Sequence, residues 1–139
     1  MRRIIEKKIE DVMTKDVITV KRDTTLKELK DMFGKHDFNV FPVVENGEIL
    51  GVVTKLSFLK IFSFDPDRLI PDLKSIYAKN AEDIMSRRII AVCSGESIQK
   101  AAKKMLDMRV RAVLVTDRSK KLIKGIITRG DIMKYVEVD

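Results

Sequence analysis

The chain carries nearly the same sequence twice, and this duplication restricts its fold more than any other feature. The tetrapeptide Asp-Val-Met-Thr at 11–14 returns at 83–86 as Asp-Ile-Met-Ser, an offset of 72 residues. Gly-Val-Val-Thr at 51–54 returns at 125–128 as Gly-Ile-Ile-Thr, an offset of 74, so the second copy has gained two residues in a turn. Two copies and a linker fill the 139 residues, and such repeats bury their apolar faces on each other. The cleft between the copies is the expected place for function.

The composition is that of a folded protein and removes several classes of function. Hydrophobic residues make up 45% and charged residues 35% of the chain, a balance that argues against disorder. No apolar run reaches the ~18 residues of a membrane span. The basic N-terminus is not followed by the apolar stretch of a signal peptide. We therefore expect a cytoplasmic protein that makes no membrane contact.

The single cysteine and the single histidine leave little room for metal or nucleophilic chemistry. Cys93 ends an apolar strand and is interpreted as a small buried hydrophobe. His36 lies among charged residues at the end of a helix, which favours an exposed or capping role. Neither residue has the spacing of a metal site or an evident partner for nucleophilic catalysis. The sequence predicts no metal, no catalytic cofactor and no enzyme activity.

The net charge of +7 leaves three interpretations open. It fits a nucleic-acid partner, an anionic small ligand, or simply a soluble surface. Acidic residues are interspersed with the basic ones, and no long basic arm is present. Charge alone does not choose among the three.

The first copy is predicted to run strand, helix, strand, strand, helix. Thr25 and Glu28 have the spacing of a capping box at a helix start, and Gly34 is a plausible helix stop. Asn46 and Gly47 form the signal of a tight hairpin. The expected elements are strands over 17–20, 40–44 and 49–54 and helices over 25–34 and 57–64.

The second copy repeats this order after a linker. Its expected elements are strands over 89–92, 112–116 and 122–128, a helix capped by Ser97, and a last helix over 131–136. In the linker, Asp65 and Pro66 resemble a helix cap and first turn. Apolar residues then recur at helical spacing, namely Leu69, Leu73, Ile76 and Tyr77. The predicted organisation is repeat 1 over 9–64, a partly helical linker over 65–80, and repeat 2 over 81–138.

The segment 125–131 at the end of the second copy has the strongest chemical character. A strand is predicted to end at Thr128, and a helix to open at Asp131. Backbone N–H groups and the Thr128 hydroxyl at such a turn attract an anion, and a carboxylate with two acceptor oxygens suits the vicinal hydroxyls of a ribose. The plainer interpretation is that Thr is a good strand former and Asp a common helix cap. Spacing alone leaves both open.

Two further features bear on this segment. Arg111 precedes a buried strand and is aimed at its end, where a guanidinium could hold a phosphate or remain solvated. In the first copy, Thr54 matches Thr128, but Ser57 stands where the second copy has Asp131. Ser brings no charge and no paired acceptor, so we expect a weaker or empty site there.

In order, each copy has an Asp-hydrophobe-Met-Ser/Thr lead-in, a strand, a helix, an apolar strand such as Pro-Val-Val, and an ending based on Gly-x-x-Thr-x-x-Asp. This order resembles the CBS domain, named for cystathionine β-synthase, here as a tandem pair called a Bateman module. The resemblance implies an α+β fold of two CBS repeats, each a three-stranded sheet with two helices, packed sheet to sheet with pseudo-twofold symmetry. It also implies clefts for adenosine-containing ligands such as AMP, ADP, ATP or S-adenosylmethionine, and association into a homodimer.

Carried over to this sequence, the resemblance implies specific roles. Thr128 would touch phosphate or ribose, Asp131 the ribose hydroxyls and Arg111 the phosphate. Arg129 is expected in the same ligand-binding site. The adenine would lie against Ile90, Val92, Val110, Ala112 and Val113. Leu114 replaces a usual Pro, which should matter little. The weaker second site would comprise Thr54, Ser57, Asn39, Ile18, Val20 and Phe41.

These features favour a stand-alone regulatory module that binds an adenosyl ligand in the cleft between the repeats and signals to a separate, unidentified protein. A nucleic-acid-binding protein using the basic surface is the second hypothesis, weakened by an aromatic content of only 6% for base stacking. A structural adaptor whose clefts bind nothing is the third.

Overall fold

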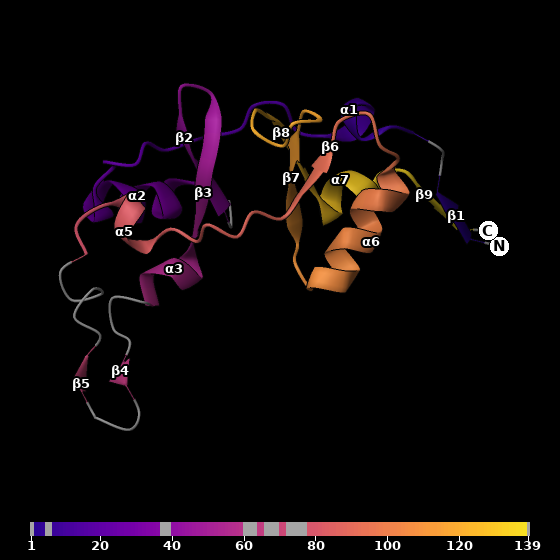
Figure 1. Cartoon of the computed structure of the whole chain (residues 1–139). Helices are drawn as coiled ribbons and strands as arrows, with labels where there is room; N and C mark the ends of the chain where they lie inside the picture. The colour runs from indigo at the N-terminus through magenta and orange to yellow at the C-terminus, as the bar shows by residue number, and fades with distance from the viewer. Residues whose placement is uncertain are drawn as a thin grey trace. The chain divides into compact units, whose positions relative to one another are not determined.

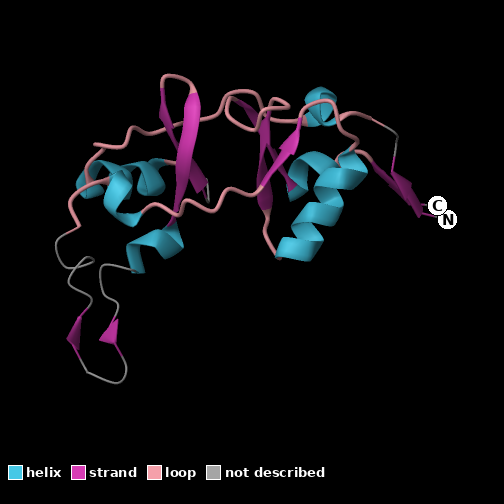
Figure 2. Cartoon of the chain, in the orientation of Figure 1, coloured by secondary structure: helices cyan, strands magenta, loops and turns pink. Residues whose placement is uncertain are grey.

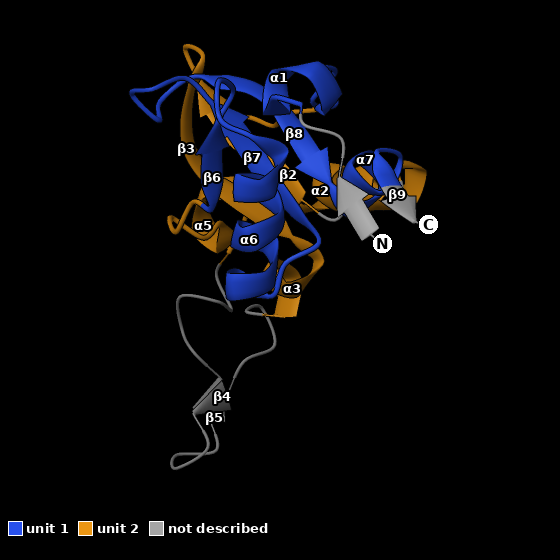
Figure 3. Ribbon diagram, turned by 90° about the vertical axis from the view of Figure 1, so that its right-hand side faces the viewer, with its two compact units in different colours: residues 1–17, 90–139 blue, residues 18–89 orange. Residues whose placement is uncertain are grey.

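The computed structural model describes residues 2–4, 7–36, 40–59, 64–65, 70–71 and 78–138. The chain divides into two compact units, coloured separately in Figure 3. Unit 1 comprises residues 1–17 and 90–139, and unit 2 comprises residues 18–89. The division cuts across the sequence repeats, because the lead-in of each copy folds with the other copy. Repeat boundaries in sequence and compact units in space are therefore different partitions of this chain.

Unit 1 is built on a three-stranded sheet (Figure 1). Its strands are β6 (Ala91–Cys93), β7 (Ala112–Thr116) and β8 (Ile123–Thr128), in the order β6-β7-β8. The first pair is parallel and the second antiparallel. Its helices are α1 (Ile9–Val12), α6 (Ile98–Met108) and α7 (Arg129–Met133), and a terminal ribbon pairs β1 (Arg2–Ile4) with β9 (Val136–Val138).

The core of unit 1 follows from the alternation of its strands and the stripe of α6. Alternate positions of β7 and β8, including Val113, Val115 and Ile127, pack with Ile98 and Ala101 of α6 in one apolar cluster. The lead-in helix α1 joins the same cluster through buried apolar side chains. Residues from the start of the chain thus complete the core of the second repeat, which fixes their position beside β8.

In the described part of the chain, unit 2 has helices that correspond to those of unit 1, but its main sheet has two strands instead of three (Figure 2). Strands β2 (Val40–Glu45) and β3 (Glu48–Thr54) form a hairpin, flanked by α2 (Leu26–Lys35), α3 (Lys55–Leu59) and α5 (Ala81–Ile84). The hairpin turn has positive φ at both Asn46 (53°) and Gly47 (80°), the conformation that its Asn-Gly sequence predicted. A T-shaped contact with ring centroids 4.7 Å apart joins Phe33 to Phe41 in the core.

The predicted first strand, 17–20, is reduced to a single bridge. Val20 bridges Val43 in parallel, through bonds of 2.9 Å from the Val20 amide to the Pro42 carbonyl and from the Val44 amide to the Val20 carbonyl. The corresponding segment of unit 1 forms β6, which starts two residues later than predicted. The expectation of three strands in each repeat is met fully only by the second.

The observed helix ends differ from the predicted ones by a few residues. Thr25 caps α2 as predicted, accepting from the Glu28 amide at 3.2 Å, but the helix runs past Gly34 to Lys35 and ends on a His36 cap. Ser97 precedes α6 without a side-chain cap bond. The last helix begins at Arg129, two residues earlier than predicted, and gives way to β9 at Val136.

Much of the predicted linker helix lies outside the described residues, including Leu69, Leu73, Ile76 and Tyr77. Asp65, expected to cap it, lies in β4 (Phe64–Asp65), which pairs with β5 (Ile70–Pro71). The helix predicted over 57–64 corresponds to α3, which begins two residues earlier, at Lys55, and is described to Leu59. Phe64, predicted to end that helix, lies instead in β4.

Candidate ligand-binding site

The strand β8 ends and the helix α7 begins at residues 128–131, called here the 128–131 corner. Thr128 is the N-cap of α7, and its hydroxyl accepts from the Asp131 amide at 3.1 Å. In return, Oδ2 of Asp131 accepts from the Thr128 amide at 3.1 Å. Both residues therefore serve the capping role that the sequence left open, and the Asp131 carboxylate is fixed in place by it.

A residue that the sequence did not single out completes this corner. The Thr14 hydroxyl donates to Asp131, lying 3.2 Å from Oδ2 and 3.4 Å from Oδ1. Its backbone bridges Ile126 of β8 through bonds of 2.8 and 2.9 Å. The signal that could have found Thr14 is its place in the repeated lead-in, but its contact is with a residue 117 positions away. Sequence spacing does not reveal such a contact.

Two arginines meet at the same corner. The Arg129 amide donates to the Arg111 carbonyl at 3.1 Å, and Ala112, the first residue of β7, pairs with Thr128. Both arginine side chains are exposed. The structure thus brings together all four polar residues predicted for this site.

The charge of the chain is concentrated in the unit that holds this corner. Unit 1 has 16 Lys and Arg against 10 Asp and Glu, a net charge of +6, whereas unit 2 has 12 against 11. The Asp131 side chain is nevertheless uncompensated locally: it is 9% exposed, and no Lys or Arg among the described residues pairs with it. Its polar contacts are with Thr14 and Thr128.

The apolar residues predicted to hold an adenine are of two kinds. Ile90, Val110 and Ala112 are partly exposed. Val92 and Val113 lie in the core of unit 1 at 6% and 2% exposure, so their side chains present little surface to any ligand. If an apolar ring is held here, the available side chains are those of the first group.

In unit 2 the equivalent corner is self-contained. The Ser57 hydroxyl accepts from the Thr54 amide at 2.9 Å and lies 3.3 Å from the Thr54 hydroxyl. Ser57 is 4% exposed. Val20 and Phe41 are buried core residues, Ile18 packs partly against that core, and Asn39 lies outside the described residues. The corner has hydroxyl groups but no carboxylate.

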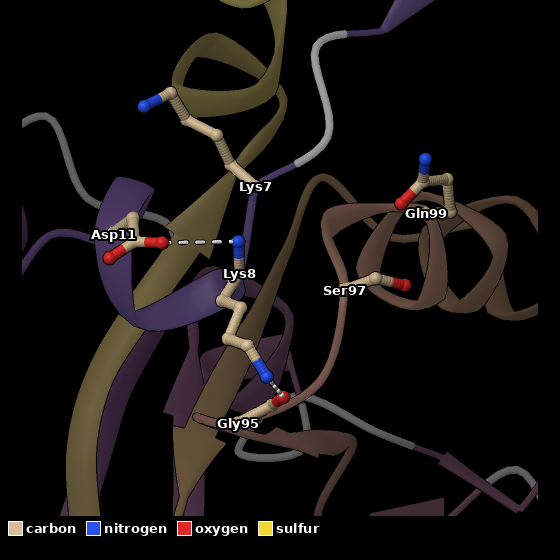
Figure 4. A pocket seen from close by; sticks show the side chains of 6 residues that line it. All are labelled: Lys7, Lys8, Asp11, Gly95, Ser97 and Gln99. Atoms are coloured by element: carbon tan, nitrogen blue, oxygen red, sulfur yellow. Dashed lines mark hydrogen bonds between the residues drawn. The ribbon is translucent and has the colours of Figure 1, made fainter.

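Two hollows among the described residues lie away from the two corners. One of about 600 Å³ in unit 1 is bounded by the N-terminal segment and the start of α6, and Figure 4 shows the Lys8 side chain reaching across it to the Gly95 carbonyl, 3.4 Å away. Another, of about 460 Å³, lies in unit 2 beside Arg22, whose guanidinium pairs with Glu45 and Glu82. Neither hollow is lined by a predicted site residue.

The remaining features considered in the sequence are the single cysteine, metal-binding groups and membrane-spanning helices. Cys93 is partly exposed rather than buried, with its sulfur 3.7 Å from the Asp117 carbonyl oxygen. Within the described ranges, no group of three or more His, Cys, Asp or Glu side chains is arranged to hold a metal ion. In the same ranges, no helix is long and apolar enough to cross a membrane.

Comparison with known proteins identifies the repeated unit. The model of the family described as the CBS domain matches residues 9–63 and 81–138. The sequence is 31% identical over 130 residues to the uncharacterized protein MJ1225 of Methanocaldococcus jannaschii, covering 91% of this chain and 46% of that protein. It is also 31% identical to inosine-5′-monophosphate dehydrogenase of the same organism, covering 92% of this chain and 23% of the enzyme. The chain spans less than half the length of these relatives.

Solved structures share the fold. The crystal structure of MJ1225 superimposes with a TM-score of 0.77 and 29% identity, over 95% of this chain and 49% of that one. The CBS domain pair of protein MJ0100, in complex with 5′-methylthioadenosine and S-adenosyl-L-methionine, gives a TM-score of 0.72 and 25% identity, with 95% of each chain covered. The mixed α+β architecture predicted from the sequence is that of CBS domain pairs.

Proposed function

Because the chain belongs to the CBS-domain family, we propose that it is a regulatory module that binds an adenosine-containing ligand rather than a catalyst. The single observation that carries this proposal is the state of Asp131. Its carboxylate is almost fully buried and is fixed by two hydrogen-bond donors. No Lys or Arg among the residues that the structure describes forms an ion pair with it. Burial of a carboxylate without a paired cation costs free energy, and hydroxyl donors from a ligand offset that cost.

The ligand would be held at the 128–131 corner by complementary groups. Asp131 accepts from the two ribose hydroxyls, and the Thr128 hydroxyl lies beside the sugar. Arg111 and Arg129 are linked by a backbone hydrogen bond, and their exposed guanidinium groups bind a phosphate where the ligand has one. The adenosyl ligands of the MJ0100 pair support this class of ligand.

We propose that each chain binds one ligand, in unit 1. The 54–57 corner of unit 2 pairs its two hydroxyls with each other and has no carboxylate for a ribose. The low net charge of unit 2 also gives a phosphate less attraction.

Binding would serve regulation by shifting a conformational equilibrium, in this chain or in a homodimer of it, that a separate protein senses. A ligand produces such a shift only if it binds one state more tightly than the other. Relatives in which the matched region is a minor part of a longer enzyme support a regulatory role for this region. A soluble, cytoplasmic setting is part of this proposal.

Calorimetry with AMP, ATP and S-adenosylmethionine, together with thermal unfolding in their presence, tests the function. Saturable binding of one ligand per chain and a rise in melting temperature are expected, because a ligand that binds only the native state stabilises it. No binding and no thermal shift with any of the three would point to the structural adaptor. Binding of a mixed-sequence oligonucleotide that falls steeply with salt, without adenosyl binding, would point to nucleic acid instead.

A further inference from the structure

The Asp131 carboxylate is held asymmetrically, and the asymmetry depends on Thr14. Oδ2 receives two donors, the Thr128 amide at 3.1 Å and the Thr14 hydroxyl at 3.2 Å. Oδ1 has a single, longer contact of 3.4 Å with the same hydroxyl. A hydroxyl carries one hydrogen, so its stronger bond is to Oδ2. The lone pairs of Oδ1 are therefore the ones left for another donor.

Thr14 is itself placed with little freedom. Its amide donates to the Ile126 carbonyl at 2.8 Å, and the Ile126 amide donates to the Thr14 carbonyl at 2.9 Å. Next to this bridge, a Cβ on Gly125 would lie 2.7 Å from the Thr14 carbonyl oxygen. Thr14 thus lies against the edge of β8 that does not pair with β7. Its bridge partner Ile126 is two residues before the start of the 128–131 corner.

The equivalent position in unit 2 has the same backbone but a different side-chain contact. Ser86 bridges Val52 through bonds of 2.8 and 2.9 Å, as Thr14 bridges Ile126. Its hydroxyl, however, accepts from the Arg88 amide at 3.2 Å, and Ser57 turns to Thr54. The backbone bridge is therefore a feature of both repeats, whereas the hydroxyl-to-carboxylate bond belongs to Thr14 and Asp131.

From this geometry we propose that Thr14 is a positioning residue for the ligand, which orients the Asp131 carboxylate so that Oδ1 faces the ribose hydroxyls. The inference rests on the proposed function and assigns to the lead-in of the first copy, residues 11–14, a part in a site otherwise built from the second repeat. Thr14 acts through Asp131 and not through a contact of its own with the ligand. Its loss leaves Oδ2 held by the Thr128 amide alone, so the carboxylate is less firmly oriented and the ribose bonds weaken.

The test compares Thr14→Val, which removes the hydroxyl at nearly constant volume, with Thr14→Ser, which keeps it, and with Ser86→Ala as the matched change in unit 2. Calorimetry uses two probes, AMP and 2′,3′-dideoxy-AMP, which lacks the ribose hydroxyls. For Thr14→Val we expect AMP affinity to fall about three- to tenfold, the range for one lost hydrogen bond, with dideoxy-AMP affinity unchanged. Thr14→Ser and Ser86→Ala should both bind AMP as the wild type does.

The outcomes separate the two proposals. A wild type that binds neither AMP nor S-adenosylmethionine overturns the proposed function, and the role of Thr14 with it. Wild-type binding that Thr14→Val leaves unaltered overturns the positioning role alone. An equal loss of both probes would show that Thr14 has only a structural role. Should Thr14→Val fail to fold, reduced AMP affinity of a folded Thr14→Ser would count against the proposal, since that variant retains the hydroxyl.

Discussion

Asp131 and Thr128 cap the same helix reciprocally, each through a 3.1 Å bond from the backbone amide of the other to a side-chain oxygen. The two residues proposed to meet the ligand are thus also the residues that start α7. A substitution at either affects stability as well as binding, so each prediction about the site needs a measurement of both.

Asp131→Asn should lower the affinity for an adenosyl ligand by about ten- to a hundredfold. The amide keeps the shape but loses the charge, and a hydrogen bond to a charged group contributes about 1.5–3 kcal/mol. The same change removes an acidic residue from the first turn of α7, which costs about 0.3–1 kcal/mol of stability. Calorimetry and urea unfolding measure the two effects.

The control is Asp107→Asn, which removes the same charge from the exposed face of α6, where Asp107 pairs with Lys103 at 2.8 Å. Its effect on affinity should be negligible. Equal affinity in the wild type and Asp131→Asn would remove this carboxylate from the site.

Arg111→Gln should weaken ligands that carry phosphate and leave adenosine unaffected. The exposed guanidinium lies at the 128–131 corner through the backbone bond from Arg129. Loss of one charged hydrogen bond to phosphate corresponds to about a tenfold rise in dissociation constant for AMP or ATP. Arg118→Gln, an exposed arginine in the β7–β8 turn, is the matched control. A similar loss for adenosine would contradict a phosphate contact.

Gly125→Ala should destabilise the protein by about 1–3 kcal/mol, the usual cost of forcing atoms into a packed site. A Cβ at this position would lie 2.7 Å from both the Met13 sulfur and the Thr14 carbonyl oxygen. We also expect weaker AMP binding, because the lead-in segment must shift away from Asp131. Urea unfolding and calorimetry provide the measurements.

Gly34→Ala is the matched control for that change. Nothing lies within 4 Å of a Cβ built at Gly34, which is in α2. Alanine is the better helix former, so this variant should be as stable as the wild type or more stable, by up to about 1 kcal/mol. Comparable destabilisation by both substitutions would mean that close packing at Gly125 is not the cause.

Glu96 should make stability depend on pH in the acidic range. The hydrogen bond from the Cys93 amide to its carboxylate at 2.8 Å, followed by the Lys100 ammonium, lowers the pKa of Glu96 below its usual value. A lowered pKa means that the contribution to stability is complete above the unfolded pKa of about 4.3 and is lost as pH falls through the folded pKa. Glu96→Gln should therefore be less stable than the wild type near neutral pH.

The difference between the two proteins should shrink progressively as the pH drops below about 4.5. Urea unfolding at several pH values from neutral to strongly acidic measures it. A difference that stayed constant across this range would show that the charge of Glu96 is not what stabilises the turn before α6.

Local patterns in the sequence were sufficient for much of the fold. The Asn46-Gly47 hairpin, the Thr25 cap and the apolar stripe of α6 each depend on residues within a few positions of one another. Such elements are set by backbone preferences and by periodicity, which are visible without neighbours from elsewhere. The same holds for the pairing of Thr128 with Asp131, three residues apart.

Predictions that failed depended on distant neighbours. The segment 17–20 has the composition of a strand, yet it forms one bridge, because strand length is decided by the register of the partner strand. Side-chain burial also depends on distant neighbours: alternation along the sheet places Val92 and Val113 in the core of unit 1, and their predicted place beside an adenine stays a prediction. Whether an apolar strand residue faces a ligand or a helix is a matter of tertiary packing.

The sequence by itself determined that this chain is a duplicated α+β protein of the CBS-domain family, because a repeat and its short-range periodicity are visible in the order of the residues alone. It also placed Thr128 and Asp131, three residues apart, where β8 meets α7. Only the tertiary structure decided that the lead-in of the first copy folds with the second and brings Thr14 to Asp131. That contact joins residues 117 positions apart, and it forms because burial of α1 in the core of unit 1 and a backbone bridge to β8 fix Thr14 there.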